Sequence, residues 1–112
     1  MTVPSLIQKL KLRDVEFPNR IVLSPMQMYA AQADGKMTDW HMVHYGKYAY
    51  AKFGTIFTEV LCVEKRGRST YADAGIWSDS HIKKLQKIAS FIRSQGSIPA
   101  AQIGHCGPKS AR

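Results

Sequence analysis

The stretch Asp79–Gly104, DSHIKKLQKIASFIRSQGSIPAAQIG, contains both kinds of element from which the fold is built. Its first part has apolar residues at three- and four-residue spacing, which predicts an amphipathic helix packed on a sheet. These positions are Ile82, Leu85, Ile88, Ala89 and Ile92. We expect Asp79 or Ser80 to cap this helix and Gly96 to end it. The last part, Ile98–Gly104, is predicted to be a strand, so a strand directly follows the helix.

The same alternation continues toward the amino terminus. Residues 55–60, TIFTEV, are rich in β-branched side chains and predict a second strand. Residues 39–52 predict a helix with Thr38 as its N-cap. Residues 20–24, RIVLS, form a short apolar run that is typical of a strand buried on both faces of a parallel sheet. Pro25 lacks a backbone donor and is expected to end the pairing of that strand.

Strands that alternate with helices predict an α/β fold with parallel βαβ units and right-handed crossovers. Three such strands fit either an open, doubly wound sheet or a closed barrel, and periodicity leaves both open. Residues 6–17 alternate between apolar and charged side chains, which predicts a hairpin or lid within residues 1–18 that turns at Arg13-Asp14. Two helices cover only one face of a sheet, and no helix follows the third strand. We therefore expect residues 1–112 to be an incomplete single domain of a longer protein.

The composition argues against several classes of protein. The 112 residues are 45% apolar and 21% charged, as in an ordinary globular domain. No apolar run approaches the roughly 18 residues of a membrane span, and the start MTVPSLIQKLK lacks a secretory signal. Cys62 and Cys106 are too few for a disulfide framework, so we expect free thiols in the cytoplasm. Cys62 follows a strand and is interpreted as a small buried side chain rather than a redox centre.

The formal charge of +8 raises the alternative of a nucleic-acid-binding protein. The basic residues are dispersed along the chain, however, and no stripe of Arg and Lys is interleaved with exposed aromatic residues. A solvated face is the preferred interpretation, and we expect neither a nucleic-acid nor a membrane partner.

Ligands of parallel α/β proteins gather at the carboxyl ends of the strands. The predicted strand ends supply the hydroxyl of Ser24, the phenol of Tyr29, the amide of Gln102 and several apolar side chains. They supply no nucleophile–base pair and no pair of carboxylates, which suits holding a cofactor better than performing hydrolysis. His41 and His44 could bind a metal, but no third ligand is suitably placed, so packing within the helix is preferred.

A series of short motifs runs in order along almost the whole chain. They are Asn19–Met26 (NRIVLSPM) with Tyr29, Asp34-Gly35 with Thr38–Tyr45 (TDWHMVHY), Thr58-Glu59, Gly67-Arg68, Gly75–Asp79 (GIWSD) and Gln102–His105 (QIGH). In this order and spacing they resemble the Old Yellow Enzyme family of NADH:flavin oxidoreductases, most closely its bacterial ene-reductase branch. The resemblance implies the amino-terminal third of a parallel (β/α)8 TIM barrel, with about three βα units after the hairpin.

The resemblance further implies FMN at the carboxyl-end mouth of the barrel. The residues that match flavin-contacting positions are Ser24, Pro25, Met26 and Gln27 after the first strand, Val60 after the second, and Gln102 on the third. Tyr29 matches a position that contacts substrate. No catalytic residue and no metal ligand is expected within the chain, since the substrate-orienting pair, the proton-donating tyrosine and the flavin-phosphate loop are expected beyond Arg112.

The implied reaction is hydride transfer from NADPH or NADH through FMN to an activated alkene, such as an α,β-unsaturated carbonyl, in a homo-oligomer. Alternatives are the flavin-reductase part of an acyl-CoA-acting fusion, a dienoyl-CoA reductase relative, and an inactive truncated chain. Two departures from the family pattern stand out. Gln27 replaces a cysteine of some bacterial members, and Cys106 and Pro108 replace the small residue and the arginine of the family's His-Ala-Gly-Arg stretch.

Overall fold

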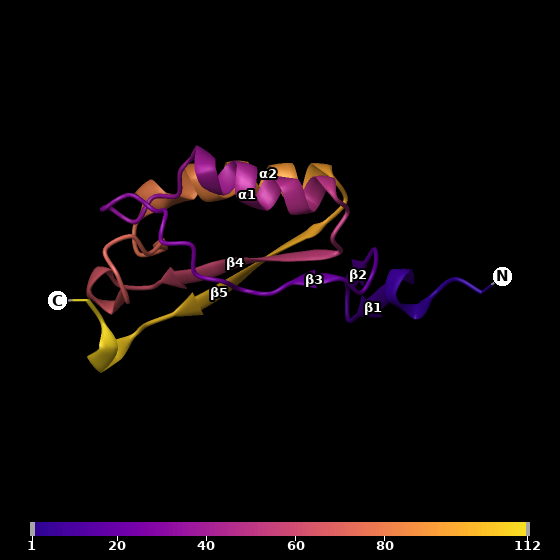
Figure 1. Ribbon diagram of the computed structural model, residues 1–112, viewed down its shortest axis with the longest axis horizontal. Helices are drawn as coiled ribbons and strands as arrows, with labels where there is room; N and C mark the ends of the chain where they lie inside the picture. The colour runs from indigo at the N-terminus through magenta and orange to yellow at the C-terminus, as the bar shows by residue number, and fades with distance from the viewer. Residues whose placement is uncertain (1, 112) are drawn as a thin grey trace.

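The computed structural model describes residues 2–111 (Figure 1). The strands are β1 Leu10–Leu12, β2 Val15–Phe17, β3 Val22–Leu23, β4 Thr55–Cys62 and β5 Ile98–Gly104, and the α-helices are α1 Asp39–Tyr50 and α2 Ile82–Ser94. Short 3-10 turns lie at Ser5–Ile7, Lys65–Gly67, Asp79–His81 and Gly107–Lys109. The order is therefore the predicted one, a hairpin followed by β, α, β, α and β.

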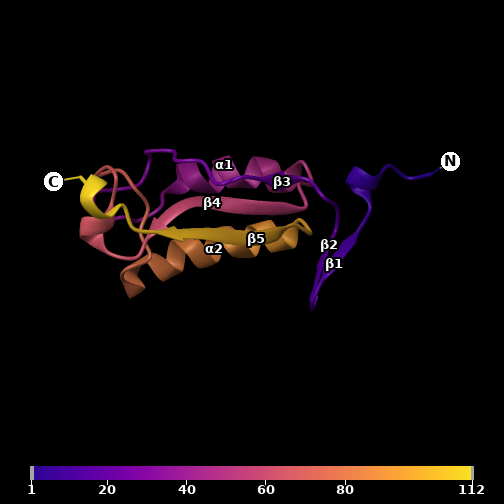
Figure 2. The same cartoon turned by 90° about the horizontal axis from the view of Figure 1, so that it is seen from below.

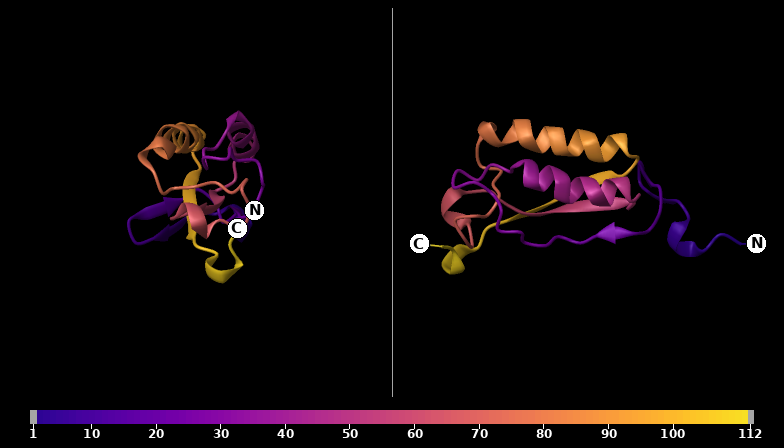
Figure 3. Two further views of the ribbon diagram at one scale, coloured as in Figure 1. Left: turned by 90° about the vertical axis from the view of Figure 1, so that its left-hand side faces the viewer. Right: turned by 45° about the horizontal axis from the view of Figure 1, so that its top comes forward.

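Strands β3, β4 and β5 form one parallel sheet in that order. Val22 pairs with Thr55 at its start, and Cys62 pairs with Gly104 at its end. Because the strands are parallel, their carboxyl ends point toward the same end of the sheet, although β3 already ends at Leu23, level with Ile56. Helices α1 and α2 lie side by side over one face of this sheet (Figures 1 and 3), and no described helix covers the other face.

The core lies between the two helices and the covered face of the sheet. Its buried apolar residues are Leu23, Met37, Tyr45, Ala49, Ile56, Leu61, Ala74, Ile88 and Ile92. Ile56 and Leu61 come from β4, and Ile88 and Ile92 from the apolar stripe of α2 that the sequence predicts. Each such aliphatic side chain contributes about 1.5–3 kcal/mol by its burial. The packing of α1 and α2 on each other and on strands β4 and β5 is therefore a main source of stability.

The start of the second helix differs from the prediction. Its cap is Ser78, one residue before Asp79, and Ser78 begins a 3-10 turn, Asp79–His81, that continues into α2 at Ile82. The Ser78 hydroxyl accepts from the Ser80 amide at 3.2 Å, which stabilises this additional turn. Thr38 caps α1 and Gly96, with φ +86°, follows the end of α2, both as predicted.

Three other boundaries differ from the predicted ones. The strand predicted at residues 20–24 pairs only at Val22–Leu23, since the Arg20 amide instead donates to the Leu6 carbonyl at 2.9 Å. Strand β4 continues beyond residue 60 to Cys62, whose amide donates to Ala74 at 3.0 Å. Helix α1 ends at Tyr50 rather than at residue 52, because Lys52 has a left-handed φ of 67°.

The predicted hairpin is confirmed, with β1 and β2 antiparallel and Arg13 in the turn at φ 54°. It lies at the amino ends of the sheet strands (Figure 2). Its apolar residues Leu10, Leu12, Val15 and Phe17 line a hollow with Val22, Phe57 and Ile98 of the sheet. The hairpin therefore covers the amino end of the sheet face that has no helix, at the end opposite to the predicted site.

Candidate functional site

The carboxyl ends of the strands place two predicted site residues side by side. Val60 and Gln102 are partners in the register of β4 and β5, so their side chains share one face of the sheet. A Cβ atom on Gly104 would lie 2.7 Å from Val60 Cγ2. Strand β5 can therefore approach the Val60 side chain this closely only because residue 104 is glycine.

A β-bulge in β4 directs Val60 to this face. Phe57 pairs with Ala100 and Val60 pairs with Gln102, so β4 advances by three residues where β5 advances by two. Since Ala100 and Gln102 are two residues apart and share a face, Phe57 and Val60 face the same side. Both are half-buried, whereas Glu59 inside the bulge is completely buried. The bulge therefore directs the Glu59 carboxylate toward the protein interior, just before the end of the strand.

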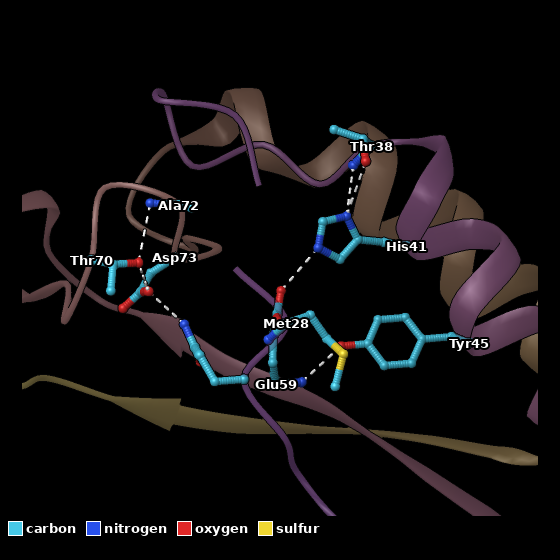
Figure 4. A network of polar contacts seen from close by, with 9 residues as sticks. Met28, Thr38, His41, Tyr45, Glu59, Thr70, Ala72 and Asp73 are labelled. Carbon is cyan, nitrogen blue, oxygen red and sulfur yellow. Dashed lines mark hydrogen bonds and ion pairs between the residues drawn. The ribbon is translucent and has the colours of Figure 1, made fainter. Parts of the chain in front are cut away.

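Glu59 holds the chain that leaves β3. Its Oε2 accepts from the Met28 amide at 2.7 Å, and its Oε1 lies 3.0 Å from His41 Nε2 on α1 (Figure 4). The Thr38 amide donates to His41 Nδ1 at 3.0 Å. Because a backbone N–H can only donate, Nδ1 carries the lone pair and Nε2–H donates to Glu59. The helix cap thus fixes the histidine tautomer that satisfies the buried carboxylate.

Tyr45 joins the same network from the next turn of α1. Its hydroxyl oxygen accepts from the Glu59 amide at 2.8 Å, in the place where the bulge interrupts the strand pairing (Figure 4). Burial is the main cause that raises the pKa of Tyr45 above its ordinary range. Tyr45 is therefore a neutral structural group that satisfies a backbone donor.

Asp73 is a second completely buried carboxylate beside the strand ends. Its Oδ1 accepts from Gln27 Nε2 at 2.5 Å and Thr70 Oγ1 at 2.6 Å. Its Oδ2 accepts from the amide and the hydroxyl of Ser69 at 2.6 and 2.7 Å. Burial raises the pKa of Asp73, but the hydrogen bonds from Thr70 and Ser69 together lower it below its ordinary value. Asp73 is therefore an ionised acceptor for a predicted site residue.

The remaining predicted residues follow β3. Ser24 and Met26 are exposed, Pro25 is half-buried, and Tyr29 is 60% exposed with a left-handed φ of 57°. The side-chain amide of Gln102 and the side-chain hydroxyl of Ser24 have no hydrogen-bond partner within residues 2–111. Ser24 follows Leu23, which pairs with Ile56 near the start of β4, and only Gln27 and Met28 are bonded to residues beside Val60, namely Asp73 and Glu59.

Sequence reasoning missed Glu59 and Asp73 as parts of the site. A lone carboxylate inside the apolar strand TIFTEVLC is a signal that could have identified Glu59, because such a group needs a buried partner. Asp73 ends a polar loop, and nothing local distinguishes it from a solvated aspartate. Its role becomes visible only when Gln27, 46 positions away, lies beside it.

These residues fit an isoalloxazine ring, the flat tricyclic group of FMN. The ring requires an apolar surface and polar groups along one edge, and Val60 and Gln102 supply these side by side. An amide can both donate and accept along such an edge. The glycine at position 104 removes the side chain that would otherwise stand beside Val60. The donor set and the open face are thus compatible with a bound flavin.

The alternative metal pair does not converge. His41 points to Glu59, whereas the His44 ring stacks on Trp40 with ring centroids 4.9 Å apart. Partial burial is the main cause that lowers the pKa of His44. Between residues 2 and 111, no three His, Cys, Asp or Glu side chains are grouped so that they could hold a metal ion. In the same part of the chain, no helix has the length and apolar character needed to cross a membrane.

The sequence profile of the NADH:flavin oxidoreductase / NADH oxidase family matches residues 5–112. The chain belongs to this flavin oxidoreductase family. The predicted resemblance is therefore confirmed.

Two relatives in this oxidoreductase family are named NADPH dehydrogenase. The chain is 43% identical over 100 residues to that of Bacillus cytotoxicus, which covers 88% of this chain and 29% of the relative. It is 41% identical over 106 residues to that of Bacillus subtilis, covering 94% of this chain and 31% of the relative. The chain thus spans less than a third of the length of these curated relatives.

A solved structure of the family has the same fold. The structure of TcOYE with pHBA superposes with a TM-score of 0.84 at 27% identity, and the match covers 96% of this chain and 29% of that chain. The hairpin and the three parallel strands with their two helices are thus the opening part of a (β/α)8 barrel, as the resemblance to the family implies. The residues described here form no closed barrel.

Proposed function

We propose that the protein containing these residues is an FMN-dependent NAD(P)H oxidoreductase. It transfers hydride from NADPH or NADH through FMN to an activated alkene, such as an α,β-unsaturated carbonyl. The observation that carries this proposal is the family match over residues 5–112. The names of the NADPH dehydrogenase relatives, at 41–43% identity, support the nicotinamide donor.

The strand ends would hold the flavin. When bound, FMN supplies the hydride chemistry that the side chains of this chain lack. Val60 provides an apolar surface for the ring, and the Gln102 amide donates to its polar edge, where donors stabilise the charge of the reduced ring. Ser24, Pro25, Met26 and Gln27 line the ring from the end of β3. Tyr29, exposed beside them, contacts the substrate.

Several properties of the whole protein belong to the same proposal. The groups that orient the substrate and donate the proton are supplied by other residues of the protein, which acts as a homo-oligomer on a small-molecule substrate. A cytoplasmic location is supported by the two cysteines, which are both unpaired. We expect no nucleic-acid partner.

The test uses the full-length protein that contains these residues. We expect a yellow protein with a visible flavin absorbance band that oxidises NADPH when cyclohexenone is supplied. Gln102→Leu should weaken FMN binding about tenfold, or ~1.4 kcal/mol, because the edge of the ring loses its hydrogen bonds. Gln86→Leu, at an exposed position on α2, is the matched control and should bind FMN as the wild type does. Absence of flavin from the purified protein, even after incubation with FMN, would contradict the proposal.

A further inference from the structure

The segment that follows β3 lies outside the sheet but carries most of the proposed flavin contacts. Strand β3 ends at Leu23, so residues 25–29 lie outside the named strands. An ordered path there requires bonds from elsewhere, because each unfixed residue costs about 1–2 kcal/mol to order. Two buried carboxylates supply such bonds on consecutive residues: Asp73 accepts from the Gln27 side chain and Glu59 from the Met28 backbone.

Both carboxylates are completely buried, which favours bonds to specific donors over solvent contacts. Hydrogen bonds to a charged acceptor are roughly twice as strong as neutral ones. A buried carboxylate without its partners would be strongly disfavoured, so the partners must stay in place. Glu59 is itself fixed by His41, and Asp73 by Ser69 and Thr70. The two acceptors are thus rigid points to which the segment is attached.

The bonds to Asp73 and Glu59 determine which groups of the segment can face a ligand. The bond to Asp73 uses one N–H of Gln27 Nε2 and fixes the orientation of the amide, which leaves the amide oxygen and the second N–H for a ligand. The bond to Glu59 fixes the Met28 amide directly before Tyr29, where the chain turns through a left-handed φ of 57°. A left-handed tyrosine costs about 1–2 kcal/mol and persists only when its surroundings hold it.

We propose that Glu59 and Asp73 are positioning residues, which clamp the Gln27–Met28 step and thereby set the flavin-facing and substrate-facing groups of this segment. This inference rests on the proposed function. Neither carboxylate touches the ring or the substrate. Each acts through the residue it holds, Asp73 through the Gln27 side chain and Glu59 through the Met28 backbone and Tyr29.

The test compares clamp variants with equally buried controls in the full-length protein. Glu59→Gln and Asp73→Asn each keep the size of the side chain but replace an acceptor oxygen with an NH2 group. We expect each to weaken FMN binding about tenfold and to shift the visible flavin band. The control for Glu59 is His81→Leu, which removes the buried bonds of His81 to Ser78 and Asp34 outside the segment. The control for Asp73 is Ser97→Ala, which removes the bond to Phe53 near the amino end of β5.

Both controls should lose stability but keep FMN affinity within about twofold of the wild type. Clamp variants that bind FMN as tightly as their controls, with an unchanged flavin spectrum, would overturn the inference. A second readout needs no flavin. The Met28 amide should exchange with deuterium at least about tenfold faster in Glu59→Gln than in His81→Leu.

The two readouts separate the two proposals. If the wild type binds no FMN, the proposed function fails, and hydrogen exchange alone then decides on the clamp. Unchanged Met28 exchange in Glu59→Gln would refute the clamp whether or not flavin is bound.

Discussion

At the scale of single residues, His41 and His81 make the same pair of hydrogen bonds at the starts of two helices. In each, Nδ1 accepts the backbone N–H of the cap residue, Thr38 at 3.0 Å or Ser78 at 3.3 Å. The other nitrogen then donates across the fold, from His41 to Glu59 and from His81 to the Asp34 carbonyl at 2.8 Å. A glutamate in a capping box could accept from the cap but could not donate onward. Histidine therefore links each helix start to a loop or strand that the helix must contact.

Cys62 provides a prediction at the same scale. Burial, and secondly the negative charge of Asp73, raise the pKa of the Cys62 thiol to about 11. Since the thiolate is the reactive form, native protein treated with iodoacetamide at pH 8 should be alkylated at the half-buried Cys106 and not at Cys62. Peptide mass spectrometry measures this, and both cysteines should react in urea. Labelling of Cys62 at the rate of Cys106 in the native state would refute its assignment as an inert buried side chain.

At the scale of elements, the sequence is informative where one periodicity governs a whole segment. The apolar spacing of α2 and the glycine after it predict that helix, and the alternation in residues 6–17 predicts the hairpin. The pattern fails where a distant partner decides. Strand β3 begins late, since the Arg20 amide donates to Leu6, and the bulge in β4 contains the buried Glu59, which bonds Met28 and His41. The predicted strand ends indicate Ser24, Tyr29 and Gln102, and the resemblance adds the other predicted site residues, but neither carries information about Asp73.

Two glycines with similar backbone angles separate conformational strain from steric overlap. Gly35 has φ +82° and Gly96 has φ +86°. A Cβ atom on Gly96 meets nothing within 4 Å, whereas one on Gly35 would lie 2.4 Å from Trp77 Cη2. Gly96→Ala should therefore cost only the left-handed strain, about 1–2 kcal/mol. Gly35→Ala should lower the free energy of unfolding by about 1–3 kcal/mol more, because Trp77 must move. Urea denaturation followed by circular dichroism measures the free energy of unfolding of both variants. Equal losses would show that Trp77 can move aside without cost.

At the scale of the whole molecule, the two faces of the sheet have different roles. The helices and the core occupy one face, and the bonds of Glu59 and Asp73 tie the loops to its carboxyl end. On the other face the hairpin lines the amino end. The same face at the carboxyl end, where Val60 and Gln102 lie, is the proposed flavin site. The packing of the helices and the proposed flavin contacts thus use opposite faces of the same two strands, β4 and β5.

This division predicts how the 112-residue chain behaves when it is prepared by itself. Val22 is 51% exposed and Ile103 is 61% exposed, and within the described residues β5 pairs only with β4. An open edge strand with apolar side chains pairs readily with other chains. We expect concentration-dependent self-association in light scattering after gel filtration, and a colourless preparation, since the proposed flavin contacts of these strands are only part of a complete site. Ile103→Lys should reduce the association by placing a charge on the edge strand. A monomer that retains FMN at high concentration would show that this part of the barrel suffices for binding.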